Sequence, residues 1–184
     1  EQGDEPGATT FTWDIYLFGP PFDADPASIN VSALSADNDF SSPDGIWFDG
    51  QGVCWIQTDD GAYTGTTHCM MLAAIPGRVG DGAARALTST LGDESRTVTT
   101  QVGAAPTTAT LRRFLVGPAG CEITGITATP DGRALFVNIQ HPGEGGDLAA
   151  LQSSWPTLDG VSRPRSATVV ITREDGGTVG GSLA

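Results

Sequence analysis

Short runs in which apolar and polar side chains alternate recur along most of the chain, separated by turns that contain glycine or proline. A period of two places successive side chains on opposite faces of a strand, so the pattern predicts an all-β fold. The segments 77–94 and 147–155 are exceptions, predicted as a short helix or loop and as a helical turn that Pro156 ends. The predicted strands cover 11–18, 45–48, 53–58, 69–75, 111–116, 122–128, 135–140 and 167–173.

A weak internal repeat relates two predicted hairpins. Gly45 and Gly125 lie 80 residues apart, and a second glycine, Gly52 or Gly132, follows each of them by seven residues. The spacing fits two β-propeller blades of about 40 residues, or one blade with a long insertion. A propeller needs at least about four blades, and this chain supplies roughly two to three. We therefore expect a partial propeller that belongs to a longer polypeptide.

Two carboxylates precede the repeated strands. Asp44 lies directly before Gly45, and Glu122 lies three residues before Gly125. The innermost strands of a propeller surround a central channel, so acids at the starts of these strands are expected to converge near the channel mouth. Carboxylates gathered in this way form a metal site.

Each of these acids also has a simpler interpretation. Asp44 stands in a Pro-Asp-Gly sequence, which is typical of a turn, and the nearby acidic segment 37–39 is either a source of further oxygen ligands or a solvated loop. Glu122 is not part of a run of charges, so it either faces water, pairs with Arg112 or Arg113, or binds a metal ion. Asp131, in the turn 129–132, is predicted to be structural.

Composition narrows the functional classes. The 184-residue chain has a formal net charge of −13, which makes nucleic acid an unlikely partner and suits a protein that binds cations such as calcium. It contains no apolar run long enough to span a membrane. Its three cysteines, Cys54, Cys69 and Cys121, lack the spacing of a zinc site and are predicted to be small buried side chains.

Four blocks of the sequence carry a resemblance to a known family: SPDGIWFDGQGVCWIQTD (42–59), MMLAAIPG (70–77), GCEITGITATPDGRALFVNIQHPGE (120–144) and RPRSATVVITREDGG (163–177). Together they resemble the C-terminal part of PhoX-type alkaline phosphatases. The resemblance implies a six-bladed β-propeller, secreted to the periplasm or beyond, that hydrolyses phosphate monoesters with calcium together with iron. It makes Asp44 the first candidate metal ligand and Glu122 the second, with Asn138 and His141 as weaker candidates.

The chain also departs from this family. It lacks the family's cysteine-containing iron-ligand segment, its histidine–glutamate segment and its arginine–proline–glutamate segment, so no cysteine here inherits the role of an iron ligand. The acidic, glycine-containing residues 1–10 are predicted to be a linker, and the resemblance implies the C-terminal part of a propeller over 11–184. The expected partners are a phosphate monoester and the remaining blades of the same polypeptide, without which the chain is predicted to be inactive.

Two other functions are compatible with the same residues. SPDGIWFD (42–49) followed by GVCWI (52–56) also resembles the repeats of calcium-dependent lactonases of the gluconolactonase type. A non-catalytic, strand-rich binding module is the second alternative, in which the acids only keep the protein soluble. The lactonase alternative leaves the strand predicted at 167–173 unexplained.

Overall fold

The fold is built from β-strands. The structure, a computed structural model, describes residues 6–59 and 66–181. Among these residues it contains nine strands and no helix, in agreement with the predicted all-β class. The strands are β1 (Pro43–Phe48), β2 (Cys54–Thr58), β3 (Met70–Ala74), β4 (Ala83–Leu91), β5 (Glu94–Val102), β6 (Leu111–Val116), β7 (Glu122–Ala128), β8 (Ala134–Gln140) and β9 (Ala167–Thr172).

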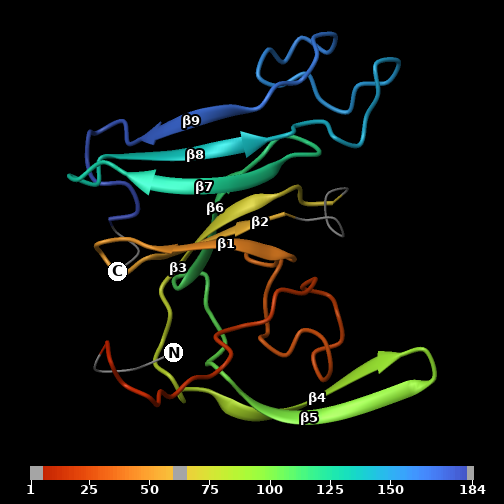
Figure 1. Cartoon of the computed structure of the whole chain (residues 1–184), viewed down its shortest axis with the longest axis vertical. Coiled ribbons are helices and arrows are strands. Elements are labelled where there is room, and N and C mark those ends of the chain that lie inside the picture. Colours follow the sequence, from red (N-terminus) through yellow and green to blue (C-terminus); the bar gives the residue numbers. More distant parts are fainter. Residues whose placement is uncertain (1–5, 60–65, 182–184) are drawn as a thin grey trace. The chain divides into compact units, whose positions relative to one another are not determined.

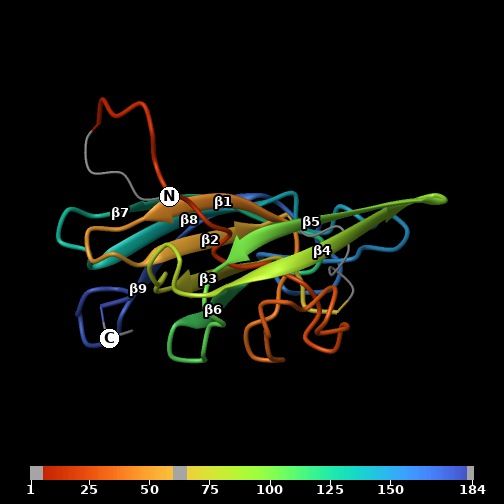
Figure 2. The ribbon, with the colours of Figure 1, turned by 90° about the horizontal axis from the view of Figure 1, so that it is seen from below.

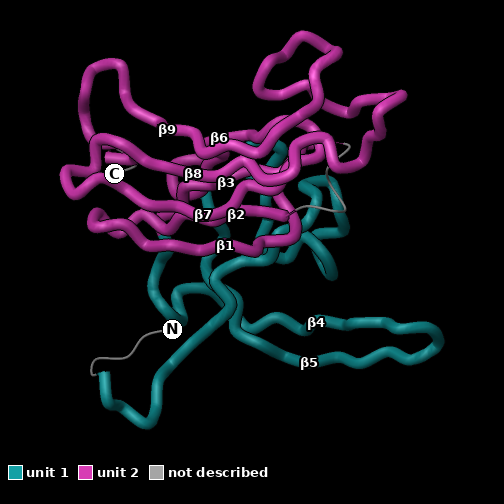
Figure 3. The backbone as a smooth tube through the Cα atoms, turned by 45° about the horizontal axis from the view of Figure 1, so that its top comes forward, with its two compact units in different colours: residues 1–39, 76–107 teal, residues 40–75, 108–184 magenta. Residues whose placement is uncertain are grey.

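The strands form three antiparallel sheets, with the orders β1-β2-β3-β6, β7-β8-β9 and β4-β5 (Figure 1). The chain divides into two compact units, drawn in different colours in Figure 3. Unit 1 comprises Glu1–Asp39 and Pro76–Thr107, and unit 2 comprises Phe40–Ile75 and Thr108–Ala184. Unit 2 therefore contains both larger sheets and every candidate ligand that the sequence analysis ranked.

Within unit 2 the two larger sheets pack against each other, and β7 contacts β1, β2 and β3. Trp55, which is completely buried, meets Phe114 edge to face with ring centroids 4.8 Å apart. Such aromatic pairs add to the stabilisation that burial of apolar area provides. The core between the sheets consists of Val53, Trp55, Cys69, Met71, Ala73, Cys121, Ile123, Leu135, Val137, Ile139 and Val179.

The repeat seen in the sequence appears as two similar hairpins, β1–β2 and β7–β8. In both, the first strand carries a β-bulge near its start, between Pro43 and Gly45 in β1 and between Thr124 and Ile126 in β7. Gly52 and Gly132 end the connecting turns with positive φ angles of 84° and 67°, a conformation that glycine adopts without strain. The hairpins thus share a bulged first strand and a glycine turn, and the extra residue of the bulge is Asp44 in β1 and Gly125 in β7.

The prediction of a short helix or loop over 77–94 is wrong from Ala83 onward. Half of that segment is β4, which pairs along its whole length with β5 across the two-residue loop Gly92-Asp93 (Figure 2). One feature of the sequence does favour a hairpin here: threonine residues lie on both sides of a glycine-containing turn. Almost every residue of this hairpin is exposed, so no buried apolar run marked it as a strand.

Two other predicted elements also differ. The segment 11–18 is not a continuous strand. Thr12 and Ile15 form isolated bridges instead, and Ile15 pairs in parallel with Val102. The Asp14 carboxylate instead accepts a hydrogen bond from the Gly80 amide. No helical turn forms over 147–155, where the Asp147 side chain caps the amides of Ala149 and Ala150.

Candidate metal centre

The candidate site lies at one edge of the two hairpins of unit 2. Antiparallel pairing places the start of β1 beside the end of β2, because Pro43 faces Thr58. In the other sheet the start of β7 lies beside the end of β8, because Glu122 faces Gln140. The residues that follow β2 and β8, Asp59 and His141, consequently lie beside the two acids that the sequence singled out.

Glu122 occupies the centre of this arrangement. It retains only 7% of its accessible surface, so the alternative that it faces water is wrong. Its Oε2 atom accepts a hydrogen bond of 2.7 Å from Nε2 of Gln140. The same oxygen lies 3.6 Å from Nε2 of His141. Arg112, one of the ion-pair partners considered from the sequence, instead donates its Nε–H to the carbonyl oxygen of Thr108.

Four potential ligands gather around this point. Ligand atoms of Asp59, Glu122 and His141 all lie within 4.8 Å of one another. Asp44 joins them through a hydrogen bond between its side chain and that of Glu122. The structure thus brings Asp44 and Glu122 together, as predicted from their positions at the starts of the repeated strands.

The backbone around His141 aims its ring at the acids. His141 has a φ angle of +37°, which is uncommon for a residue other than glycine. Its amide donates to the Ser166 hydroxyl, and its carbonyl accepts from the Glu144 amide, so a tight turn begins at this residue. The Nδ1 atom lies 3.5 Å from Oε2 of Glu144, while Nε2 points to Glu122. The imidazole is held between two carboxylates.

This crowding has an electrostatic consequence. The pKa of Glu122 is raised above 4.5, first because burial disfavours its charged form and then because of the negative charges of Asp59 and Asp44. The hydrogen bond to Asp44 raises this pKa further by holding a proton on Glu122, whereas His141 lowers it. A cation between these acids would replace that proton and relieve their repulsion.

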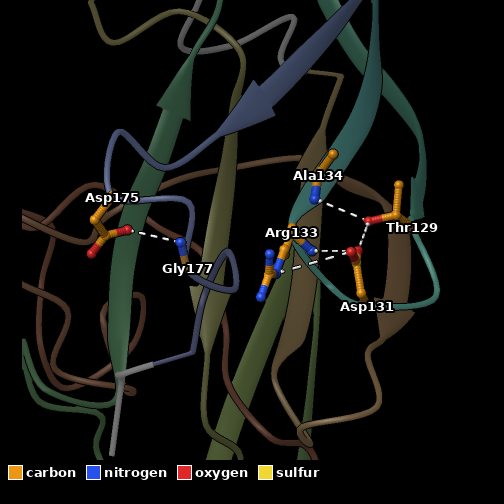
Figure 4. A network of polar contacts seen from close by, with 6 residues as sticks. All are labelled: Thr129, Asp131, Arg133, Ala134, Asp175 and Gly177. Atoms are coloured by element: carbon orange, nitrogen blue, oxygen red, sulfur yellow. Dashed lines mark hydrogen bonds and ion pairs between the residues drawn. The ribbon is translucent and has the colours of Figure 1, made fainter.

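Two other residues considered from the sequence have structural partners. Asn138 accepts a hydrogen bond of 2.7 Å from the Thr168 hydroxyl on β9. Asp131 accepts hydrogen bonds from the Thr129 hydroxyl and the Arg133 amide within its own turn (Figure 4). The prediction that Asp131 is structural is therefore confirmed.

The acidic segment 37–39 belongs to unit 1, where the Asp39 carboxylate accepts a hydrogen bond from the Phe22 amide. The three cysteines are buried, as predicted, and retain at most 2% exposure. Burial raises the pKa of Cys54 to about 11 and that of Cys121 to about 12. Both are therefore neutral thiols, which are poor metal ligands.

Comparison with known proteins gave two matches. The family described as alkaline phosphatase PhoX matches residues 1–143. The chain belongs to this family. A solved structure of Pseudomonas fluorescens PhoX in complex with vanadate, a transition state analogue, is 35% identical with a TM-score of 0.62. A search of curated proteins gave no match.

The likeness to PhoX covers 89% of this chain and 23% of the solved chain, so the protein spans about a quarter of that length. PhoX is a propeller protein, and the likeness supports the predicted partial propeller. Within the described residues there is no helix with the length and hydrophobicity that a membrane crossing requires.

Sequence reasoning missed three residues of this candidate site: Asp59, Gln140 and Glu144. Asp59 closes the block 42–59 and follows a fully buried strand, so the antiparallel pairing of that hairpin was the available signal. Once β1 and β2 are paired, the residue after β2 must lie beside the start of β1. The contacts of Gln140 and Glu144 depend on the turn after β8, which no motif predicts.

Proposed function

We propose that this PhoX-family chain supplies calcium ligands to a metal-dependent phosphatase that hydrolyses phosphate monoesters. The observation that carries the proposal is the convergence of three carboxylates, from Asp44, Asp59 and Glu122, at adjacent edges of two sheets. Membership of the alkaline phosphatase PhoX family supports the reaction class. It favours that class over the lactonase and the binding module.

The residues fit calcium well. Calcium prefers six to eight oxygen ligands in a flexible geometry, and three carboxylates supply up to about six oxygens. The raised pKa of Glu122 supports the same conclusion. Carboxylates that raise one another's pKa values are typical of functional sites, and a bound cation would offset their mutual repulsion. We assign Asp44, Glu122 and Asp59 as ligands and His141 as a neighbouring group.

Iron fits these residues less well. The thiols of Cys54 and Cys121 are buried in the core with raised pKa values, and the acids gather instead around one imidazole. We therefore propose that iron, which the family resemblance implies, takes its principal ligands from outside this chain. The chain's own contribution is the calcium side of the centre.

The side chains at this edge have two kinds of role, binding the cation and orienting the groups that bind it. A bound divalent cation neutralises phosphate charge and lowers the pKa of bound water, which supplies an oxygen nucleophile. Gln140 fixes Oε2 of Glu122 by a hydrogen bond. His141 lies between two carboxylates, with Nδ1 3.5 Å from Oε2 of Glu144 and Nε2 3.6 Å from Oε2 of Glu122. Without a cation the acids repel a phosphate dianion, so metal binding must precede substrate binding.

The remaining proposals rest on the family. The substrate is a phosphate monoester, and further propeller blades of the same polypeptide complete the metal centre, because the chain spans 23% of the solved PhoX chain. The compartment is the periplasm or the exterior of the cell. The predicted linker over residues 1–10 and propeller part over 11–184 remain proposals as well.

Thermal unfolding with millimolar calcium, with EDTA as the control, tests the site directly. Hydrolysis of p-nitrophenyl phosphate is assayed in the same samples. We expect a higher Tm with calcium and no turnover, because a ligand that binds the native state stabilises it by mass action. An unchanged Tm overturns the calcium assignment. Turnover shows that the chain completes the centre alone and overturns the need for further blades.

A further inference from the structure

Strands β1 and β7 each carry a bulge close to a proposed ligand, Asp44 in β1 and Glu122 in β7. The bulges raise the question of what fixes the distance between the two carboxylates. In β7 the register passes from Thr124 to Ile126, so Gly125 is the extra residue without a partner in β8. A bulge interrupts the ladder and leaves its extra residue's backbone groups to find other partners. The Gly125 carbonyl finds one in the other sheet.

That partner is Gln57 on β2. Its Nε2 atom donates to the Gly125 carbonyl oxygen at 3.2 Å, across 68 residues of sequence. Gln57 retains 2% of its accessible surface in a strand whose five residues are all buried. A buried amide is costly unless it is hydrogen bonded, so its presence in this strand calls for a specific role.

Gly45, which follows the bulged residue Asp44 in β1, makes room for this amide. Gly45 faces Gln57 in the β1–β2 register. A Cβ atom on Gly45 would lie 2.7 Å from Oε1 of Gln57, closer than such contacts occur. Gly45 directly follows Asp44, and Gly125 lies three residues after Glu122. One buried amide therefore binds the bulged residue of β7, Gly125, and faces the residue that follows the bulged Asp44 in β1.

We propose that Gln57 is a positioning residue that sets the separation of Asp44 and Glu122 for cation binding. The proposal rests on the calcium site proposed above. The hydrogen bond from Gln57 ties β2 to β7, and the pairing of β2 with β1 carries that constraint to Asp44. Gly45 also takes part in this positioning, because the absence of a side chain there leaves space for the Gln57 amide.

The experiment is a double-mutant cycle on the whole chain with calcium as the probe. Gln57→Met keeps the approximate shape of the side chain and removes its donor. Gly45→Ala retains Gln57 and displaces its amide. Apparent calcium affinity is measured by titration, and bound terbium is substituted for calcium to read its luminescence lifetime. Ile56→Val, at the neighbouring buried position of β2, controls for a general loss of stability.

We expect each single variant to lose about tenfold in calcium affinity, the range typical of residues that orient metal ligands. The double variant should lose little more, because both changes act on one hydrogen bond. The terbium lifetime should shorten as water replaces a displaced carboxylate oxygen. Ile56→Val should unfold at a lower temperature and bind calcium like the wild type.

Two results overturn the inference. If the wild type binds calcium, and Gln57→Met and Gly45→Ala bind it equally well, Gln57 has a purely structural role. Should Gln57→Met not fold, Gly45→Ala alone decides, because it leaves the buried amide in the chain. A wild-type chain that binds no calcium overturns the proposed function, and this inference with it.

Discussion

The two ends of the hairpins in unit 2 use the same residue types in opposite ways. At the turn end, Asp49 accepts hydrogen bonds from the amides of Gln51 and Val53 and from Nε1 of Trp55. At the other end, Glu122 is surrounded by Asp44 and Asp59, which oppose its ionisation. Carboxylates that accept hydrogen bonds from the backbone stabilise the folded protein. Carboxylates that face other carboxylates lower its stability, and a bound cation can offset that loss.

The pKa shifts express the same difference. Asp131, in the β7–β8 turn, has a lowered pKa, first because of the Thr129 hydroxyl and then because of the Arg133 amide. Glu122, at the other end of β7, has a raised pKa, first because of its burial. Hydrogen-bond donors favour the carboxylate, and burial beside like charges disfavours it. Four predictions test this contrast, from the largest expected effect to the smallest.

Replacing both predicted ligands should have the largest effect. The double variant Asp44→Asn, Glu122→Gln removes two negative charges from the site, so we expect calcium affinity to fall by about 100-fold or more. Isothermal titration with calcium measures this change. Asp131→Asn is the matched control at the turn end and should bind calcium like the wild type. Equal losses in both variants would contradict the contrast between the two ends.

Removing the acid of the β1–β2 turn should mainly reduce stability. Asp49→Ala deprives Nε1 of the buried Trp55 and two backbone amides of their acceptor, which should lower the free energy of unfolding by about 2 kcal/mol. Chemical denaturation measures the loss. Calcium should still raise the Tm of this variant, and a variant that loses the calcium response would show that the two ends are coupled.

Stability of the chain in EDTA should fall as the pH rises above the ordinary pKa of Glu122. Because the folded-state pKa is raised, the folded protein holds a proton that the unfolded chain has released, from about pH 4.5 up to the raised value. In Glu122→Gln this decline should be smaller. Denaturation at a series of pH values measures it, and the same slope in both proteins would refute the raised pKa.

The smallest effect is expected in the β7–β8 turn at low pH. The lowered pKa of Asp131 stabilises the fold above its ordinary value of 3.8, and this contribution disappears as the pH falls through the lowered pKa. Asp131→Ala should therefore be less stable than the wild type at neutral pH and approach it in acid. Thermal unfolding at pH 7 and pH 2 compares the two proteins. A constant difference would assign the effect to lost packing.

The sequence was sufficient for the elements with a buried face. The hairpin 45–58 and the strands 122–128 and 167–173 were predicted almost to the residue, because their alternation and glycine turns report local geometry. The convergence of Asp44 and Glu122 also followed, since both begin repeated strands. Their role as metal ligands stays a prediction.

Other features depend on distant pairing. The exposed hairpin β4–β5 has no buried face, so hydrophobic periodicity carried little signal for it. The segment 11–18 alternates like a strand yet forms isolated bridges in place of a ladder. The register of β1 and β2 places Asp59 beside the site, and a hydrogen bond between the two sheets joins Gln57 to Gly125. Neither contact has a local motif.

The exposed β4–β5 hairpin has a consequence for the motions of the chain. Its cross-strand pairs include hydroxyl contacts between Thr88 and Thr97 and between Thr90 and Ser95, but little apolar area is buried along it. A two-stranded ribbon of this kind is marginally stable in water. Its amide hydrogens should therefore exchange with solvent long before those of the buried strand β3, through local openings that leave the rest of the fold intact.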